Sequence, residues 1–325
     1  MEENVFHNRV DLSALNESIV KIRSEIAKII VGQEEMVNLL VTAILADGHV
    51  LIEGVPGVAK TLTAKLLSKV ISVKFTRIQF TPDLMPSDVL GTSVYNMKSG
   101  DFEFKSGPIF SNIVLIDEIN RAPAKTQSAL FEVMEERQVT VDGRTYQMEA
   151  PYIVVATQNP IEQEGTYRLP EAQLDRFLFK INVHYPALED EVSIIKGHHA
   201  RKGHQPVAEV TAVLSAEDIR KYRSVVQHIH VEENLLEYIA RIIVETRNNP
   251  SLFLGASPRA SVAILNSSKA FAALNGRDFV TPEDVKYVTR PVLRHRVVLT
   301  PDKEMEGVTA DEVIKLIIDK IEVPR

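Results

Sequence analysis

Residues 49–61, His-Val-Leu-Ile-Glu-Gly-Val-Pro-Gly-Val-Ala-Lys-Thr, decide how the chain folds. The pattern predicts a buried strand, then a loop with glycines at 54 and 57, then a helix that begins at Lys60 and Thr61. The first turn of a helix has unpaired N–H groups and the positive end of the helix dipole, and both attract phosphate. The stretch therefore predicts a loop that binds the phosphates of a nucleotide. An ordinary glycine-proline turn before an amphipathic helix is the alternative.

The positions of this loop have separate expected roles. Gly54 and Gly57 let the backbone turn where a β-carbon would block a phosphate. Lys60 is expected to reach the β- and γ-phosphates, and the Thr61 hydroxyl to ligate Mg²⁺. The general motif has glycine where this chain has Ala59, and we expect a small residue with negative φ to start the helix there. The expected nucleotide-binding residues are Gly54, Val55, Pro56, Gly57, Val58, Ala59, Lys60, Thr61 and Leu62.

A second strand ends in two carboxylates. The apolar run 113–116 is followed by Asp117 and Glu118, and an open α/β sheet binds its ligand at the carboxyl ends of its strands. Asp117 is expected to hold Mg²⁺, and Glu118 to polarise the attacking water as general base. A strand that simply meets a solvated acidic loop is the alternative.

Three further polar residues complete the expected site. Asn159 follows the apolar strand 152–157 and would lie beside the other two strand ends, where it could orient water. Arg176 follows Leu-Asp in the segment 174–177. Arg259 lies in the first turn of a helix that Ser257 would cap, where a cation opposes the helix dipole. That placement is easier to understand if Arg259 faces a phosphate, although an arginine that points to water is the alternative.

Together these motifs resemble those of the AAA+ ATPases, and their amino-acid sequences are similar to those of the MoxR family. The segments that carry the resemblance are Gly-Val-Pro-Gly-Val-Ala-Lys-Thr at 54–61, Ile-Asp-Glu-Ile-Asn-Arg-Ala-Pro at 116–123, Ala-Thr-Gln-Asn-Pro at 156–160, Leu-Pro-Glu-Ala-Gln-Leu-Asp-Arg-Phe at 169–177 and Gly-Ala-Ser-Pro-Arg at 255–259. Ala59 departs from the general loop motif but agrees with the usual Ala-Lys-Thr ending of the MoxR family. The resemblance covers the whole chain.

The resemblance implies a fold and a set of roles. The fold class is α/β, a P-loop AAA+ core whose parallel sheet is flanked by helices and carries two inserted β-hairpins, plus a smaller all-α lid domain. The family binds ATP with Mg²⁺ and assembles a ring, in our interpretation a hexamer, in which Arg176 would serve the neighbouring subunit's γ-phosphate. Asn159 would act as the water sensor and Arg259 as the lid sensor, while Val31 and Gly32 would pack on adenine. A client or adaptor with a von Willebrand factor A domain is the partner that the resemblance implies.

The domain organisation follows from the change in pattern along the chain. Two hairpins are expected, one through 94–104 and one through 138–147 with Asp-Gly at its turn. They would face a ring pore or a partner, or else be inert edge decorations. Beyond 185–186 helical patterns take over, at 190–202, 215–228, 231–247, 258–274 and 281–290. We therefore expect the nucleotide-binding core at 1–188 and the lid at 189–325.

Composition limits the classes of function. At 325 residues and 45% hydrophobic, the chain is long enough for two domains. The lack of cysteine excludes disulfides and thiolate metal sites and fits a reducing compartment. The start at 1–7 is acidic where a secretory signal would be basic and then apolar, and no apolar run approaches the ~20 residues of a membrane helix. We expect a cytoplasmic protein without membrane insertion.

Other functions remain as alternatives at this stage. The motor subunit of a magnesium chelatase would share both hairpins, and a DNA-associated ATPase would share the phosphate loop. The net charge of −7 argues mildly against a nucleic-acid surface. A nucleotide-gated scaffold with negligible turnover is a further alternative, against which the presence of Glu118 and Arg176 argues.

Overall fold

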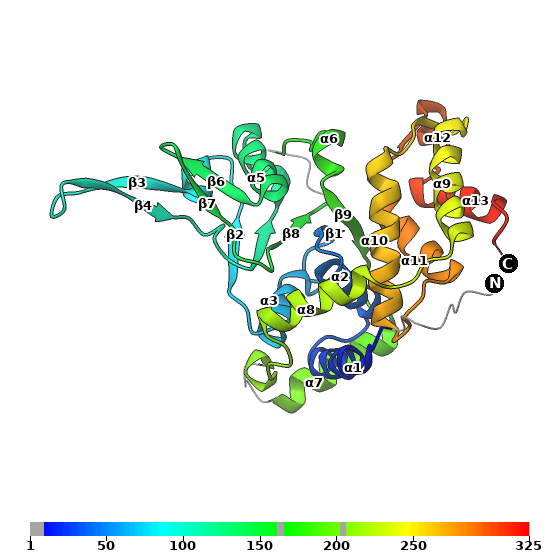
Figure 1. Cartoon of the computed structure of the whole chain (residues 1–325), viewed down its shortest axis with the longest axis horizontal. Coiled ribbons are helices and arrows are strands. Elements are labelled where there is room, and N and C mark those ends of the chain that lie inside the picture. The colour runs from blue at the N-terminus through cyan, green and yellow to red at the C-terminus, as the bar shows by residue number, and fades with distance from the viewer. Residues whose placement is uncertain (1–9, 161–165, 202–205, 325) are drawn as a thin grey trace, which may run out of the picture.

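The computed structural model describes residues 10–160, 166–201 and 206–324 (Figure 1). Its elements are α1 (Ser13–Ala27), α2 (Glu34–Leu45), β1 (His49–Gly54), α3 (Lys60–Val70), β2 (Phe75–Gln79), α4 (Pro86–Leu90), β3 (Gly91–Asn96), β4 (Asp101–Ser106), β5 (Ile113–Asp117), the 3₁₀ turn η1 (Ile119–Arg121), α5 (Ala124–Glu136), β6 (Gln138–Val141), β7 (Arg144–Gln147), β8 (Ile153–Gln158), α6 (Glu171–Leu174), β9 (Phe177–Val183), α7 (Leu188–Arg201), η2 (Pro206–Glu209), α8 (Ala216–Gln227), α9 (Glu233–Asn248), β10 (Leu252–Leu254), α10 (Pro258–Leu274), α11 (Pro282–Leu293), β11 (Val298–Leu299), α12 (Pro301–Met305) and α13 (Ala310–Lys320).

The centre of the molecule is a parallel sheet with the strand order β2-β5-β8-β1-β9. The three strands that the sequence predicted therefore lie side by side, with β8 between β5 and β1. The strand register places Gln79 of β2 beside Asp117 of β5, and Glu53 of β1 beside Gln158 of β8. The carboxyl ends of the strands consequently meet at one edge of the sheet, as the expected site requires.

Side chains alternate between the two faces of each strand, as the period of two dictates. In β1, Val50 and Ile52 join one hydrophobic cluster while Leu51 joins the other, and β5 divides in the same way. The smaller cluster packs the sheet against α4 and α5. The larger cluster packs it against helices α1, α2 and α3 and continues into the C-terminal helices. Because both faces are covered, the central strands are nearly continuous apolar runs.

Both predicted hairpins are present. β3 and β4 pair antiparallel and extend from the body at the left of Figure 1, and β6 and β7 pair around Asp142 and Gly143, which both have positive φ. Positive φ at two successive residues is the geometry that favours Asp-Gly in a tight hairpin turn. The hairpins contact each other where Phe104 stacks on Tyr146 with ring centroids 4.3 Å apart.

The C-terminal region is helical, as predicted. The expected helix 258–274 matches α10, and the helices at 215–228 and 281–290 correspond to α8 and α11, which begin with capping boxes at Ser215 and Thr281. The last residue of the expected helix 190–202 lies outside the described residues. The sequence did not indicate the small antiparallel pair of β10 with β11, nor helices α12 and α13.

The lid and the core share one hydrophobic interior. The expected boundary at residue 188 coincides with the start of α7, but the larger cluster runs from Leu15 in α1 to Ile317 in α13 without a break at that point. Three consecutive residues after α11 also bond the edge strand β9: Arg294 donates to Lys180 O, His295 bonds Phe177 O and Arg296 donates to Leu178 O. The lid therefore covers the backbone edge that β9 would otherwise expose.

Candidate nucleotide-binding site

The expected phosphate loop and strand ends enclose one pocket. It has a volume of about 380 Å³, and its lining residues are Pro56, Gly57, Ala59, Lys60, Thr61, Leu62, Arg77, Gln79, Asp117, Glu118, Thr157 and Asn159. The loop between β1 and α3 supplies one wall, and the ends of β2, β5 and β8 supply the other. The structure thus brings together groups that lie as far apart in the sequence as Pro56 and Asn159.

The start of α3 differs from the expected geometry. We expected Ala59 to have a negative φ, and this was wrong: its φ is +61° and its ψ is 18°, in the left-handed region. The loop must turn sharply enough to direct its N–H groups inward, and this is the conformation for which most such loops use glycine. A residue with a β-carbon pays about 1–2 kcal/mol there, so Ala59 stores strain in the loop. Gly57, at φ +88°, takes the same region without a steric penalty.

Lys60 folds back onto its own loop. Its ammonium group donates to the Gly54 carbonyl at 2.5 Å, and half-burial lowers its pKa, an effect that the nearby carboxylates of Asp117 and Glu118 oppose. A flexible four-carbon stem lets the ammonium group leave this carbonyl for a stronger acceptor. The arrangement keeps the cation at the mouth of the loop, where phosphate oxygens would be bound.

The pair Thr61 and Asp117 fits a Mg²⁺ site. Thr61 Oγ1 lies 3.5 Å from Asp117 Oδ2, at the outer limit of a hydrogen bond, and adjacent ligands of octahedral Mg²⁺ are about 3 Å apart. Asp117 is buried, and its second partner is Arg77, whose Nε lies 2.5 Å from Oδ2. Hard oxygen donors on opposite walls of a phosphate pocket are the ligands that Mg²⁺ prefers.

Glu118 is fixed by its backbone and by two donors. It has a left-handed φ of +57°, which turns its side chain out of the strand direction. Gln79 Nε2 donates to its carboxylate at 2.7 Å, and Arg121 Nε lies 3.1 Å from the same oxygen. Glu118 therefore presents a carboxylate to the pocket from a fixed position, as a general base must.

Thr157, in the neighbouring strand β8, forms hydrogen bonds with both Asp117 and Glu118. Its hydroxyl donates to Asp117 Oδ1 at 3.0 Å and accepts from the Glu118 N–H at 3.1 Å. Asn159, two residues further on, lines the pocket as expected. Sequence reasoning missed Thr157, Arg77 and Gln79. The alternation of Arg77 and Gln79 at the end of a strand beside β5 was the available signal, but the strand itself was not assigned.

The structure places the two expected arginines together and away from this pocket. Arg176 Nη2 lies 2.8 Å from Glu135 Oε2, and Arg259 Nη2 lies 3.1 Å from Glu135 Oε1. Neither arginine is among the pocket's lining residues. Ser257 occupies the position before α10 as expected, but its hydroxyl donates to Asp175 at 3.2 Å and does not cap the helix.

Val31 and Gly32 lie in the turn between α1 and α2, and neither lines the phosphate pocket. Gly32 has a φ of +71°, and a β-carbon there would lie 2.5 Å from the Asp190 carboxylate of α7.

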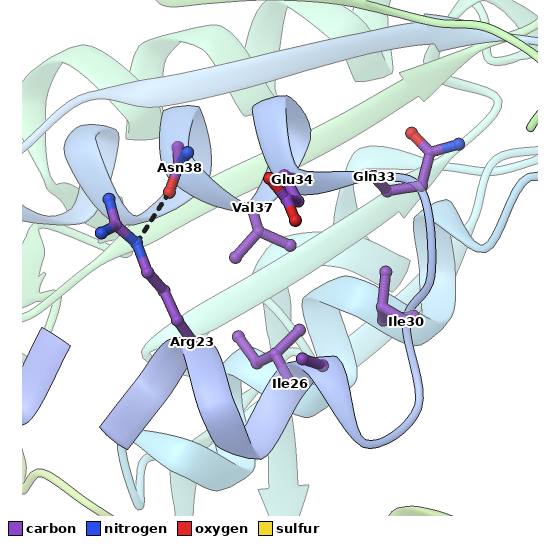
Figure 2. A pocket seen from close by; sticks show the side chains of 8 residues that line it. Arg23, Ile26, Ile30, Gln33, Glu34, Val37 and Asn38 are labelled. Atoms are coloured by element: carbon purple, nitrogen blue, oxygen red, sulfur yellow. Dashed lines mark hydrogen bonds between the residues drawn. The ribbon is translucent and has the colours of Figure 1, made fainter. Parts of the chain in front are cut away.

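Beside this turn a second pocket of about 290 Å³ separates α1 from α2. Figure 2 shows Ile26, Ile30 and Val37 facing one another across it. Arg23, Gln33, Glu34 and Asn38 also line the pocket, so its walls combine apolar and polar side chains.

Comparison with known proteins places the chain in a family. The model of the ATPase family associated with various cellular activities matches residues 49–179, and that of the AAA lid domain matches residues 244–317. The chain is 45% identical to the chaperone MoxR1 of Mycobacterium tuberculosis, over 93% of this chain and 81% of that protein. It is 30% identical to the protein MoxR of Methylorubrum extorquens, over 96% and 97% of the two chains. The chain belongs to the MoxR family of AAA+ ATPases.

A solved structure agrees with this assignment. A crystal structure from Cytophaga hutchinsonii, described as that of a candidate ATPase, matches with a TM-score of 0.88 and 41% identity, over 96% of this chain and 97% of that one. The predicted AAA+ fold, with its parallel sheet and helical lid, is confirmed. As a MoxR-family AAA+ ATPase, the protein binds and hydrolyses ATP. Within the described residues, no helix combines the length and the apolar character that crossing a bilayer requires.

Proposed function

We propose that this MoxR-family ATPase forms a ring, a hexamer, and uses ATP hydrolysis in the cytoplasm to remodel or mature a client protein. The observation that carries the proposal is the division of the catalytic groups between two places. The groups that bind phosphate and activate water line one pocket, whereas Arg176 and Arg259 meet outside it on Glu135. A site divided in this way is complete only when a second subunit supplies the arginines.

Within one subunit, the residues of the pocket have distinct roles. Lys60 and the N–H groups at the start of α3 bind the β- and γ-phosphates. Thr61 and Asp117 would hold Mg²⁺, which when bound would neutralise charge on the phosphate oxygens. Glu118 accepts a proton from the attacking water, and Asn159 orients that water. Val31 and Gly32 contribute to the adenine site from the turn before α2.

The arginines act on the adjacent subunit's nucleotide. A guanidinium stabilises the charge that spreads over the equatorial oxygens of the transferred phosphoryl group, an effect worth about 10³-fold or more in rate in other P-loop enzymes. Arg176 follows α6 and Arg259 begins α10, so the core and the lid would each supply one cation. Hydrolysis would then depend on assembly, because an isolated subunit lacks these cations at its own pocket.

The client is a protein that carries a von Willebrand factor A domain. Support for a chaperone-like role comes from the name of the Mycobacterium tuberculosis relative, a chaperone. The hairpin β3–β4, which extends from the body (Figure 1), exposes apolar side chains, with Met97 86% and Phe102 68% exposed. An exposed apolar hairpin suits contact with another protein, either in the ring pore or at its rim.

Two variants test the assignment of the pocket. Lys60→Ala should abolish ATP binding, whereas Glu118→Gln should keep binding and lose hydrolysis, because Lys60 contacts the ground-state phosphates and Glu118 acts only on water. Nucleotide binding is measured by equilibrium titration and hydrolysis by phosphate release. Equal loss of binding in both variants would contradict the assignment.

Mixed rings test the shared site. Arg176→Ala subunits should bind ATP normally and hydrolyse it poorly, and mixing them with Glu118→Gln subunits should restore part of the activity. An Arg176→Ala subunit keeps its own base and can use the arginine of an adjacent Glu118→Gln subunit. If mixed rings form but remain as inactive as either parent, the shared site is refuted. The Glu118→Gln protein, trapped with ATP, is also the form in which to measure binding of a purified von Willebrand factor A domain.

A further inference from the structure

Glu135, whose carboxylate pairs with both Arg176 and Arg259, has no role in the function proposed so far. Glu135 lies in the last turn of α5, next to the end of that helix. A negative charge at this end opposes the helix dipole and costs about 0.3–1 kcal/mol. Its two cationic partners compensate for this placement, and each of them uses a different oxygen of the carboxylate.

The contacts are arranged as a bridge. Arg176 comes from the segment after α6, Arg259 from the first turn of α10, and Glu135 from α5, so three elements distant in the sequence meet at one carboxylate. Two guanidinium groups held near each other repel, and a carboxylate between them removes that repulsion. Since a guanidinium has five N–H donors, a bond through one nitrogen leaves donors for a phosphate oxygen.

The backbones that carry the arginines are fixed independently of Glu135. The buried side chain of Arg296 donates from Nε to Asp175 Oδ1 at 2.6 Å and from Nη2 to the Asp175 carbonyl at 2.9 Å. Ser257 bonds the other oxygen of Asp175. The residue beside Arg176 is therefore tied to the residue two positions before Arg259. Glu135 is left to order the long side chains, which are 29% and 61% exposed.

We propose that Glu135 is a positioning residue whose carboxylate holds Arg176 and Arg259 together, so that both reach the phosphate bound by the adjacent subunit. The inference rests on the proposed shared site. Glu135 touches no reacting atom and acts through the two arginines. Its effect should appear in the rate of hydrolysis and leave nucleotide affinity unchanged, because the adjacent pocket binds its nucleotide with its own Lys60 and Thr61.

The test compares Glu135→Gln with Glu136→Gln. Both changes remove one negative charge from the end of α5, and Glu136 makes no ion pair with either arginine in the part of the chain that the structure describes. Glutamine keeps the shape of the side chain but not its charge, so ion-pair geometry is lost without a cavity. In assembled rings, Glu135→Gln should lower kcat about tenfold and leave KM for ATP unchanged within about twofold. The expected loss of kcat is smaller than the roughly 10²-fold that a misplaced catalytic group can cost. Glu136→Gln should match the unaltered protein.

Mixing then separates positioning from a general structural defect. A Glu135→Gln subunit keeps its own general base, and an adjacent Glu118→Gln subunit keeps its arginines correctly held. The site formed between these two subunits should therefore hydrolyse ATP at the normal rate. Circular dichroism and light scattering confirm that each variant folds and assembles. An unchanged or raised kcat in Glu135→Gln would overturn the inference. So would a lowered kcat that Glu118→Gln subunits fail to rescue while they do rescue Arg176→Ala. Failure to rescue Arg176→Ala itself would refute the shared site, and the role of Glu135 with it.

Discussion

Replacing Thr157 with valine tests how the pocket holds its two carboxylates in place. Thr157 is 3% exposed, so the nearly isosteric valine fits the same space. The change removes the hydrogen bond to Asp117 Oδ1 and the bond from the Glu118 N–H, and water has little access from the Thr157 side to replace them. Glu118 is affected most directly, because this bond anchors its left-handed backbone.

The size of the effect follows from the two lost bonds. Leaving a buried or half-buried N–H without a partner costs about 1–3 kcal/mol, and a hydrogen bond to a charged group contributes about 1.5–3 kcal/mol. Asp117 keeps its contact with Arg77 and faces the open pocket, so the second loss is partly offset. We expect the free energy of unfolding to fall by about 2–3 kcal/mol, and ATP hydrolysis to fall because Glu118 is no longer held.

Thr42→Val is the matched control. Thr42 is also buried, and its hydroxyl donates to the Asn38 carbonyl one helical turn before it, at 2.7 Å, so the loss of this bond should cost less than about 1 kcal/mol. Unfolding in urea is followed by circular dichroism, since the chain has no tryptophan. If Thr157→Val is no more destabilising than Thr42→Val, the hydrogen bonds of Thr157 do not hold the strand ends together.

Three further predictions concern pH, Mg²⁺ and nucleic acid. Burial, with a smaller contribution from Arg137, lowers the pKa of His49 to about 4. Between pH ~6.5 and ~4 only the unfolded chain binds this proton, so stability should fall by about 1.4 kcal/mol per pH unit as the pH drops. In urea titrations His49→Gln should show a shallower dependence, and an unchanged slope would contradict this. Arg77→Gln should lower the free Mg²⁺ concentration needed for half-maximal hydrolysis, because Arg77 competes with Mg²⁺ for the Asp117 carboxylate. If Arg77→Gln needs more Mg²⁺ than the unaltered protein, this competition is refuted. DNA binding measured by fluorescence anisotropy at physiological salt should be weaker than about micromolar, and tighter binding would revive the DNA-associated alternative.

The sequence was sufficient for features that depend on local pattern. The apolar runs that become β1, β5 and β8, and the Asp-Gly turn of the second hairpin, carry their signals within a few residues. All the pocket-lining residues between Pro56 and Leu62 belong to the set expected from the sequence, because a glycine-rich loop before a helix defines that set locally. Gly54, Val55 and Val58 of the expected set are not among the lining residues.

The features that escaped prediction depend on distant partners or on backbone geometry. Strand β2 is half exposed and mixes Arg77 and Gln79 with apolar residues, so nothing within it separates a strand from a loop. Thr157 was counted as part of an apolar strand, since its partners lie about 40 residues away. The conformation of Ala59 follows from the turn that the loop must make, and the local preference of alanine is for negative φ. The meeting of two arginines on Glu135 is a tertiary contact with no local signature.

The continuous hydrophobic interior of core and lid limits which parts of the protein can move relative to each other during ATP hydrolysis. Close-packed interiors deform little, and three residues after α11 fasten the lid to β9. A hinge within the subunit would have to break this packing and these hydrogen bonds. In the proposed ring, we therefore expect the subunits to rotate against one another as rigid bodies, with deformation concentrated at the contacts between them. Cross-linking α11 to β9 should then leave the remodelling of the client intact, while cross-links between neighbouring subunits should abolish it.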